Sequence, residues 1–566
     1  MRFIFPLILA IGLALGARLF YWQILQWDLL SARALTQQLN EEPIHAPRGD
    51  IKTNDGVILA REVYLYTIRL TIPAQGLSKP QEWARDLAPI LNQTYDQVLA
   101  KLTAKGKVVA LATDTTAKIG EGMREYKNTH RISNLEITSR AVRTYPLGRF
   151  AAQVIGFVNL QGVAALGIEL GKDTELRGVD GKKGGTWTAF RDDRIPIELP
   201  DDVPPIPGAE IILTINSRIQ RIVETELERA VRDARASSGT IIVMDPQTGA
   251  VLAMASYPST DLNAYSNPAN VGKYNNPAIS AQFEPGSIFK VITIAAALEA
   301  ETISSATVFE DNGVYALGGR EIFNHDKIAP GRVNLVDVFK LSLNVEAAKI
   351  SVGMGAARFY ESVRNFGFGA RTRIELAAEI AGEVRIPGSC CWHDIDLGTN
   401  AYGQGIAVTP LQAISAIAAV ANQGKLMKPY IVQNTRLADG RNIKTNPEVV
   451  RQVIRPATAR LVTELLAQAI GAESSNKALV PGYRIAGKTG TASIPIAGGL
   501  DPNATIASFV GYLPADEPRV VVLVKIDKPQ TSEWGSQIAS PVFASVAKQI
   551  APLLGILPDE VRAKTK

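Results

Sequence analysis

Cysteine and histidine are scarce in this chain of 566 residues, and their scarcity argues against two kinds of stabilising site. The only two cysteines, Cys390 and Cys391, are adjacent, so the sequence cannot form a scaffold of several disulfides. None of the four histidines has the HxxxH or HExxH spacing of a histidine-built zinc site. The fold must therefore depend on ordinary core packing.

A large excess of charge of one sign is also missing. The chain has 60 basic and 55 acidic residues, a formal net charge of +5, which is too small to indicate a nucleic-acid partner. Hydrophobic residues make up 46% and charged residues 20% of the chain, as in globular proteins that bury real cores. At about 100–200 residues per domain, the length allows roughly three to five domains or two large ones.

Long hydrophobic runs are missing except at the N-terminus. Residues 3–17 carry no charge, and the apolar run continues past Arg18 to Trp22. Twenty residues at about 1.5 Å rise span about 30 Å, the thickness of one hydrocarbon core. The run therefore predicts a membrane anchor, with Arg18 near one end and Tyr21 and Trp22 at the interface. A cleaved signal peptide is the alternative.

A proline-rich segment at 201–208, DDVPPIPG, predicts a domain boundary. Before it, short β-like runs alternate with turns and one helical stretch near 80–104. After it, strands at both ends bracket a helical middle that reaches about residue 470, a pattern typical of an antiparallel sheet with helices packed on it. One helical run of this middle section is VFKLSLNVEAAKISVGM, residues 338–354.

The pattern Ser-x-x-Lys places an amine one helical turn after a hydroxyl, so that an unprotonated lysine can take the hydroxyl proton. It occurs at Ser287–Lys290, Ser474–Lys477 and Ser545–Lys548. Only the first follows a turn, FEPG, and opens a strongly apolar helix. There a helix N-terminus favours negative charge on the serine, and apolar surroundings lower the pKa of the lysine. The other two pairs are expected at the surface.

A literal match to the nucleotide-binding pattern GxxxxGK[ST] runs from Gly482 to Thr489. The residues between its glycines are typical of a strand, and the sequence after Lys488, TGTASIPIAGG, opposes the helix that a phosphate-binding loop needs. The sequence therefore disfavours the alternative of a P-loop nucleotide-binding protein.

Three short motifs follow one another in the order SxxK, SxN and KTG: Ser287–Lys290, Ser342–Asn344 and Lys488–Thr491. This ordered set is the signature of the penicillin-recognising serine acyltransferases. The stretches FEPGSIFK, YGQGIAVTPLQ and AGKTGTA also resemble the C-terminal motifs of one class of these enzymes. RGDI at 48–51, RTYP at 143–146 and GIE at 167–169 resemble the N-terminal motifs of the same class.

Over essentially its whole length the chain thus resembles the class B penicillin-binding proteins, the bitopic D,D-transpeptidases of peptidoglycan synthesis. The resemblance implies an α+β fold in three parts: a membrane anchor with a juxtamembrane helix at 1–42, an elongated α+β pedestal at 43–208, and a β-lactamase-like transpeptidase domain at 209–566, with an antiparallel sheet flanked by helices. Leu343 within SxN and Asn216 after ILTI depart from the usual pattern, but neither replaces a catalytic group.

The resemblance implies a role for each residue of the first two motifs. Ser287 would attack the carbonyl between the two terminal D-alanines of a stem peptide, with Lys290 as the base. Ser342 would relay a proton to the leaving amine, and Asn344 would hold the substrate amide or Lys290. An amine of a neighbouring peptide would then resolve the acyl-enzyme and form the cross-link.

The third motif is implied to bind the substrate. Lys488 would supply positive charge for the terminal carboxylate of the donor peptide, beside the hydroxyls of Thr489 and Thr491 that flank Gly490. The backbone N–H groups of Ser287 and Thr491 would form an oxyanion hole. β-Lactams would acylate Ser287 in the same way. No metal and no organic cofactor is implied.

Within the class, a short connection from MASYPS to FEPGS and an early end after the last helix favour the division enzyme over the elongation type. The resemblance then implies septal cell-wall synthesis, with a SEDS-family glycan polymerase and other divisome membrane proteins as partners. It also implies a single-pass protein of the inner (cytoplasmic) membrane with its catalytic domain outside the cytoplasm. A D,D-carboxypeptidase and a scaffold without catalysis are the alternatives, and the intact motifs argue against the scaffold.

Three expectations concern geometry. The side chains of Ser287, Lys290, Ser342 and Lys488 should converge in one groove. Burial and like charge should lower the pKa of Lys290. In the pedestal, the Arg of RGDI and the Glu of GIE, Arg48 and Glu169, should form an ion pair, because a guanidinium binds a carboxylate well even where both are buried.

Overall fold

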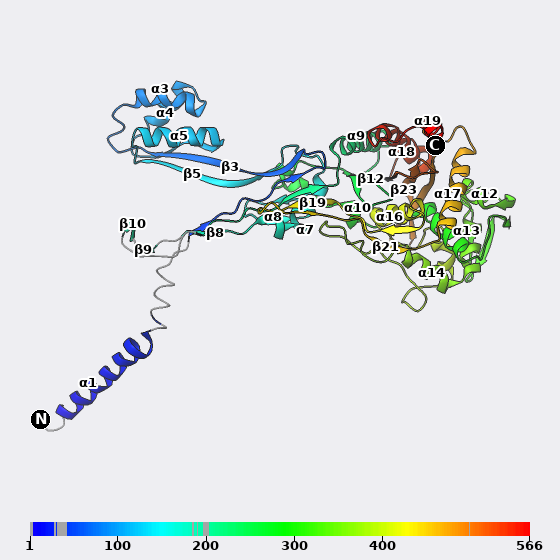
Figure 1. The fold of residues 1–566 in the computed structure, drawn as a ribbon, viewed down its shortest axis with the longest axis horizontal. Helices are drawn as coiled ribbons and strands as arrows, with labels where there is room; N and C mark the ends of the chain where they lie inside the picture. Colours follow the sequence, from blue (N-terminus) through cyan, green and yellow to red (C-terminus); the bar gives the residue numbers. More distant parts are fainter. Residues whose placement is uncertain are drawn as a thin grey trace. The chain divides into compact units, whose positions relative to one another are not determined.

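A computed structural model describes residues 4–27, 30, 42–183, 186–188, 191–195, 203–496 and 499–565. The chain forms two compact units, each made of two segments: Met1–Gly49 with Arg177–Ala209, and Asp50–Leu176 with Glu210–Lys566. The expected α+β fold is confirmed, since helices accompany largely antiparallel strands (Figure 1).

The smaller unit begins with the apolar helix α1 (Ile4–Phe20), which continues into the π-helical turn η1 (Tyr21–Leu25). Within them, Ile8–Leu25 is long and apolar enough to cross a membrane, as the sequence predicts. The expected juxtamembrane helix falls on residues that lie, apart from residue 30, outside the described part of the chain. Two short antiparallel pairs complete this unit: β1 (Glu42–Ile44) with β8 (Gly181–Lys183), and β9 (Thr186–Thr188) with β10 (Arg191–Ile195).

The larger unit opens with a sheet whose central strand is β3 (Ile58–Thr71). This strand pairs antiparallel with β4 (Val108–Thr115) and β5 (Leu135–Thr144). Figure 1 shows three helices stacked against these strands: α3 (Pro80–Leu91), α4 (Tyr95–Leu102) and α5 (Ala117–Thr129). The apolar faces of the amphipathic helices meet Ile68 and Leu70 of β3 in one small core.

The same sheet also contains strands from the far part of the chain. β2 (Ile51–Lys52) pairs with β3 on one side and runs parallel to β11 (Glu210–Leu213) on the other. β11 then pairs with β19 (Val432–Arg436), which pairs with β20 (Asn442–Lys444). The sheet therefore contains strands more than 350 residues apart in sequence, such as β3 and β19, which are connected through β2 and β11.

Between this sheet and the C-terminal part, the chain forms five short elements around a buried ion pair. The elements are α6 (Ala152–Ile155), β6 (Phe157–Val158), β7 (Ala164–Ala165), α7 (Gly167–Gly171) and α8 (Asp173–Arg177). Arg143 Nε donates to Glu169 Oε1 over 2.6 Å, and the two side chains are 3% and 0% exposed. The sequence prediction paired Glu169 with Arg48. That pair stays a prediction, because Arg48 belongs to the smaller unit.

A five-stranded antiparallel sheet forms the centre of the C-terminal part, in the order β13-β12-β24-β23-β22. Its strands are β12 (Ser238–Met244), β13 (Val251–Tyr257), β22 (Ala486–Ile496), β23 (Gly499–Leu513) and β24 (Val520–Asp527). Residues 520–526 of β24 are all buried, because helices cover both faces of the sheet. Even-numbered residues from Val520 to Ile526 face α9 (Ser217–Asp233) and α18 (Gly535–Leu553), whereas Val521 and Leu523 face the helical middle section.

The middle section packs on that second face. Its helices are α10 (Pro277–Ser280), α11 (Lys290–Glu299), α12 (Leu335–Lys340), α13 (Asn344–Met354), α14 (Ala356–Asn365), α15 (Asp394–Asn400), α16 (Pro410–Ala421) and α17 (Pro456–Gly471). Small hairpin-like pairs accompany them: β14 (Val308–Asp311) with β17 (Gly331–Asn334), β15 (Val314–Leu317) with β16 (Arg320–Phe323), and β18 (Lys425–Met427) with β21 (Val449–Gln452). The chain ends in α19 (Asp559–Thr565).

One expectation for this section is wrong. The run 338–354, predicted as a single helix, is divided between α12 and α13, and Ser342 lies in the break with a φ of +56°. A left-handed backbone is unfavourable for a serine, so tertiary contacts must hold it. The interruption turns the hydroxyl of Ser342 out of a helix and toward the groove described below.

Candidate active site

Ser287 lies on a short 3₁₀ turn, Gly286–Phe289, that runs directly into α11. Gly286 has a φ of +55°, and a Cβ built on it would lie 2.8 Å from the carbonyl oxygen of Thr491. A side chain is therefore excluded at this position. Its absence allows the turn that carries Ser287 to pack directly on strand β22.

Other glycines make the same close packing possible. A Cβ on Gly490 would lie 2.4 Å from Ser508 Oγ and 3.0 Å from the carbonyl oxygen of Pro285. A Cβ on Gly403 would lie 2.3 Å from the carbonyl oxygen of Gly286, whose N–H donates to Gly403 O over 3.2 Å. The expected glycine of KTG thus has a steric reason, and the turn from YGQGIAVTPLQ supports the nucleophile turn.

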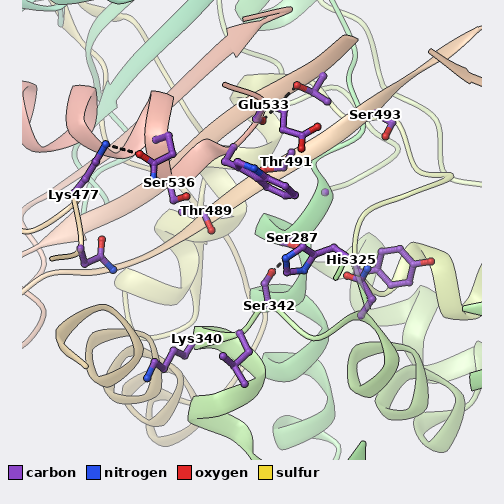
Figure 2. Close-up of a pocket in the computed structure, with 18 of the residues that line it drawn as sticks. Ser287, His325, Lys340, Ser342, Lys477, Thr489, Thr491, Ser493, Glu533 and Ser536 are labelled. Carbon is purple, nitrogen blue, oxygen red and sulfur yellow. Dashed lines mark hydrogen bonds between the residues drawn. The ribbon is translucent and has the colours of Figure 1, made fainter. Parts of the chain in front are cut away.

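A chain of hydrogen bonds joins the first two motifs. Ser342 Oγ donates to Ser287 Oγ over 2.8 Å, and Lys290 Nζ donates to Ser342 Oγ over 3.2 Å. The same amine donates to Asn344 Oδ1 over 2.8 Å and to the carbonyl oxygen of Ser342. Figure 2 shows Ser287 and Ser342 side by side at the groove. The predicted convergence is confirmed for Ser287, Lys290 and Ser342.

The two lysines of the motifs are both buried, with exposed fractions of 0% for Lys290 and 4% for Lys488. Burial lowers the pKa of Lys290 well below its ordinary value, the charge of Lys488 lowers it further, and the carboxylate of Asp311 acts in the opposite direction. Burial also lowers the pKa of Lys488 to about 7. The predicted direction for Lys290 is confirmed, and its neutral form can accept a proton.

Lys488 lies within strand β22, at the edge of the sheet. Its Nζ donates to the carbonyl oxygen and to Oγ1 of Thr489, each over 3.2 Å. Thr491 Oγ1 accepts a hydrogen bond from the N–H of Gly535 over 3.1 Å. Because the segment after Lys488 continues as a strand, the helix that a phosphate-binding loop requires is not formed there.

A cavity of about 570 Å³ opens above these residues, and Ser287, Ser342, Asn344, Thr489 and Thr491 contribute to its lining (Figure 2). The volume is that of a pocket for a peptide-sized or drug-sized ligand. Gly286 contributes to its lining, and most of the other lining side chains carry hydroxyl or amide groups. The arrangement is suited to acyl transfer, since a nucleophilic hydroxyl and further hydroxyl groups line one space, and the amine of Lys290 is hydrogen-bonded to one of these hydroxyls, that of Ser342.

Several lining residues were not predicted from the sequence. His325 and Trp534 form an edge-on aromatic contact with ring centroids 5.3 Å apart. Lys477, expected to be a surface residue, is exposed and also lines the cavity, where its Nζ donates to Gln537 Oε1 over 2.5 Å. None of these four belongs to the ordered set of SxxK, SxN and KTG motifs, so only their place in the fold brings them to the groove.

The third Ser-x-x-Lys pair, Ser545–Lys548, does not line the cavity. Ser545 lies on α18, where its hydroxyl contacts Arg229 and Gln549, and Lys548 is exposed. Cys390 and Cys391 are exposed free thiols. The described residues contain no cluster of histidine, cysteine and acidic side chains that could hold a metal ion.

Two protein-family models match the chain. The penicillin binding protein transpeptidase domain matches residues 239–548, and the penicillin-binding protein dimerisation domain matches residues 43–213. The first covers more than half of the chain and includes all three motifs.

Curated relatives match along most of their own length. Stage V sporulation protein D of Bacillus subtilis is 29% identical over 98% of this chain and 85% of that protein. The peptidoglycan D,D-transpeptidase FtsI of Escherichia coli is 28% identical, over 99% and 92%. Penicillin-binding protein PbpB of Mycolicibacterium smegmatis is 32% identical, over 82% and 73%.

Solved structures have the same fold. Penicillin binding protein 3 of Mycobacterium tuberculosis, complexed with aztreonam, superposes with a TM-score of 0.70 at 25% identity, over 91% of this chain and 98% of that one. Penicillin binding protein 2X of Streptococcus thermophilus gives 0.79 at 21% identity, over 93% and 82%. With the site geometry and the family matches, these findings establish that the chain belongs to the penicillin-binding protein transpeptidases and is a peptidoglycan D,D-transpeptidase of the serine type.

Proposed function

We propose that Ser287 is the nucleophile of this transpeptidase and Lys290 its general base. The supporting observation is the hydrogen-bond chain from Ser287 through Ser342 to Lys290, whose amine has a strongly lowered pKa. Ser287 Oγ attacks the carbonyl between the terminal D-alanines, and its proton passes to Lys290 Nζ. The bond to the last residue then breaks, and D-alanine leaves as an amine that takes a proton relayed by Ser342.

The second half of the reaction reverses these proton transfers. The amine of a neighbouring stem peptide attacks the ester carbonyl, gives its proton to Lys290 and forms the new amide bond. The ester bond breaks, and Ser287 regains its proton. Asn344 holds Lys290 in place, since its Oδ1 accepts a hydrogen bond from the amine.

The third motif binds the donor peptide in this proposal. The terminal carboxylate faces Lys488 and the hydroxyls of Thr489 and Thr491, which line the cavity on either side of Gly490. The N–H groups of Ser287 and Thr491 form the oxyanion hole, an arrangement supported by the close packing of the nucleophile turn on β22. β-Lactams acylate Ser287 along the same path.

We further propose that the chain works in septal cell-wall synthesis, with its anchor at 1–42 in the inner membrane and the pedestal (43–208) and transpeptidase domain (209–566) outside the cytoplasm. The short connection before FEPGS supports the division type over the elongation type. A SEDS-family glycan polymerase and other divisome proteins are the proposed membrane partners. A carboxypeptidase, which would use water in place of the acceptor amine, is the second candidate.

Labelling with a fluorescent penicillin tests the catalytic assignment. The full-length protein in detergent is expected to take up one label per chain, Ser287→Ala none, and the decoy variant Ser545→Ala the same amount as wild type. Label retained in Ser287→Ala would overturn the assignment. Imaging of a tagged copy in dividing cells tests the septal role, which a uniform distribution along the cell wall would contradict.

A further inference from the structure

We propose that Asp311 and Asn324 are positioning residues of the transpeptidase, which together hold the SxN turn so that Asn344 and Ser342 can grip Lys290. The inference rests on the proposed roles of Ser287 and Lys290. Neither Asp311 nor Asn324 belongs to the three motifs, and neither lines the groove. Both are buried, with exposed fractions of 0% and 1%.

The helix that begins with Asn344 has no cap of its own. Leu343 occupies the N-cap position of α13, where a serine, threonine, aspartate or asparagine would normally accept a backbone N–H. Asn324, which directly follows β16, supplies that acceptor from another element. Its Oδ1 accepts the N–H of Asn344 over 2.9 Å and that of Val345 over 3.2 Å.

Asp311 fixes the orientation of the capping amide. Asn324 Nδ2 donates to both carboxylate oxygens of Asp311, over 3.1 Å and 2.9 Å. The N–H of Gly313 donates to Asp311 Oδ1 over 2.8 Å and holds the carboxylate in turn. Because only the amide nitrogen can donate, the carboxylate forces the amide oxygen of Asn324 toward α13.

The same strand end also holds the side chain of Asn344. Asn344 Nδ2 donates to the carbonyl oxygen of Phe323 over 3.1 Å, which leaves Asn344 Oδ1 pointing to Lys290. Backbone and side chain of Asn344 are thus fixed by two consecutive residues, Phe323 and Asn324. A tilt at the start of α13 would move the acceptor of Lys290 and, through the left-handed turn, the hydroxyl of Ser342.

Asp311 also acts on Lys290 by charge. Its carboxylate raises the pKa of Lys290, against the larger effect of burial and against the charge of Lys488 from β22. The charge of Asp311 also raises the pKa of Glu346 of α13, whose Oε1 forms an ion pair with Lys349 Nζ over 2.7 Å. Removing the charge of Asp311 should therefore lower the pKa of Lys290, which a purely structural residue would leave unchanged.

Acylation of the full-length protein in detergent by a fluorescent penicillin, measured as a second-order rate constant, tests the proposal. Asn324→Leu removes the acceptor and is expected to slow acylation about 10²-fold, the cost of a misplacement of about 1 Å. Asn324→Asp places two carboxylates against each other and is expected to be slow as well. The exchange variant Asp311→Asn/Asn324→Asp restores one amide and one carboxylate, so it should recover most of the loss.

Asn216→Leu is the matched control. Asn216 caps α9 by accepting the N–H groups of Arg218 and Ile219, but it lies outside the groove. This variant should lower the thermal unfolding midpoint and leave the acylation rate unchanged. The pH profile gives the second readout: in Asp311→Asn the acid limb of acylation should move to lower pH, and in the exchange variant it should return toward wild type.

The outcomes separate this inference from the proposed function. If wild type is not acylated at Ser287, the proposed function itself fails. If wild type is acylated and folded Asn324→Leu is acylated at the same rate, only the positioning role is overturned. Where Asn324→Leu does not fold, the comparison between Asn324→Asp and the exchange variant decides: recovery supports the role, and equal rates overturn it. An acid limb that stays in place in Asp311→Asn overturns the effect of charge.

Discussion

The two ends of the larger unit bury charge in opposite ways. Near the pedestal strands, Arg143 and Glu169 form a close ion pair whose side chains are 3% and 0% exposed. At the active site, Lys290 and Lys488 share one buried region, and the charge of each lysine is poorly compensated. Both arrangements remove ions from water, which is costly unless partners replace the solvent.

The difference shows how one fold uses the cost of burial. Opposite charges at hydrogen-bond distance attract each other, and the pair holds its segments together. At the active site, burial shifts the proton equilibria instead: it lowers the pKa of Lys488 to about 7 and the pKa of Lys290 well below its ordinary value, and the charge of Lys488 lowers the pKa of Lys290 further. The first arrangement supports structure, and the second prepares a base.

Removal of the base should have the largest effect. Lys290→Met is expected to slow acylation of Ser287 by about 10²–10⁴-fold, the usual contribution of a general base. The variant should fold, because a methionine fills the apolar position without a charge. Fluorescent-penicillin labelling with time checks the rate, and a rate equal to wild type would refute the role of Lys290.

Breaking the ion pair between Arg143 and Glu169 should have the next largest effect, on stability. Arg143→Met leaves Glu169 buried without its guanidinium, which should lower the free energy of unfolding by about 3–5 kcal/mol. Urea denaturation of the full-length protein measures this loss. The double variant Arg143→Met/Glu169→Leu should recover most of it, and the acylation rate per folded molecule should stay unchanged in both. A fall in that rate would show that the two regions are coupled.

Replacement of Lys488, the second buried lysine, should raise the stability of the protein, whereas breaking the ion pair should lower it. Lys488→Met is expected to raise the thermal midpoint while it weakens acylation. In a domain of more than about 250 residues, a gain of about 1 kcal/mol corresponds to roughly 2 °C or less. Lys477→Met, at an exposed position of the same groove, is the control and should leave the midpoint unchanged. A lower midpoint for Lys488→Met would mean that this lysine is paired as strongly as Arg143.

The last prediction concerns the dependence of stability on pH. The pKa of Lys488 is about 7 in the folded protein and near 10.4 in an unfolded chain, so between these values the unfolded state binds more protons. The stability of wild type relative to Lys488→Met should therefore rise from pH 7 toward pH 10. Paired denaturation curves at several pH values measure the difference, and a constant difference would contradict the low pKa.

The sequence predicts the reactive residues of the site better than the tertiary contacts that hold them in place. SxxK, SxN and KTG are local patterns, and each lies in the groove as expected. The break around Ser342 was missed, because residues 338–354 contain no proline and their one glycine, Gly353, comes after the break, so that the apolar spacing suits one helix. Its cause is tertiary: the capping acceptor for α13 comes from Asn324, twenty residues before Asn344.

The same limit applies to the pedestal. Arg143 and Glu169 both belong to the N-terminal motifs of the chain, RTYP and GIE, yet the sequence does not predict that they pair. Arg143 lies next to the last residue of β5, whereas Glu169 lies on a five-residue helix. Only the folded chain brings the two together. A charge pattern names candidates for burial. It cannot say which opposite charge each candidate meets.

The glycines beneath Ser287 have a consequence for antibiotic selection. Gly286, Gly403 and Gly490 lie so close to neighbouring backbone or side-chain atoms that an added carbon at any of them would clash in or beside the turn that carries the nucleophile. A mutation there would abolish cell-wall cross-linking together with drug binding, and so could not spread under treatment. Resistant variants of this enzyme should instead change exposed residues of the cavity lining, such as Lys477 and Trp534, and keep these three glycines.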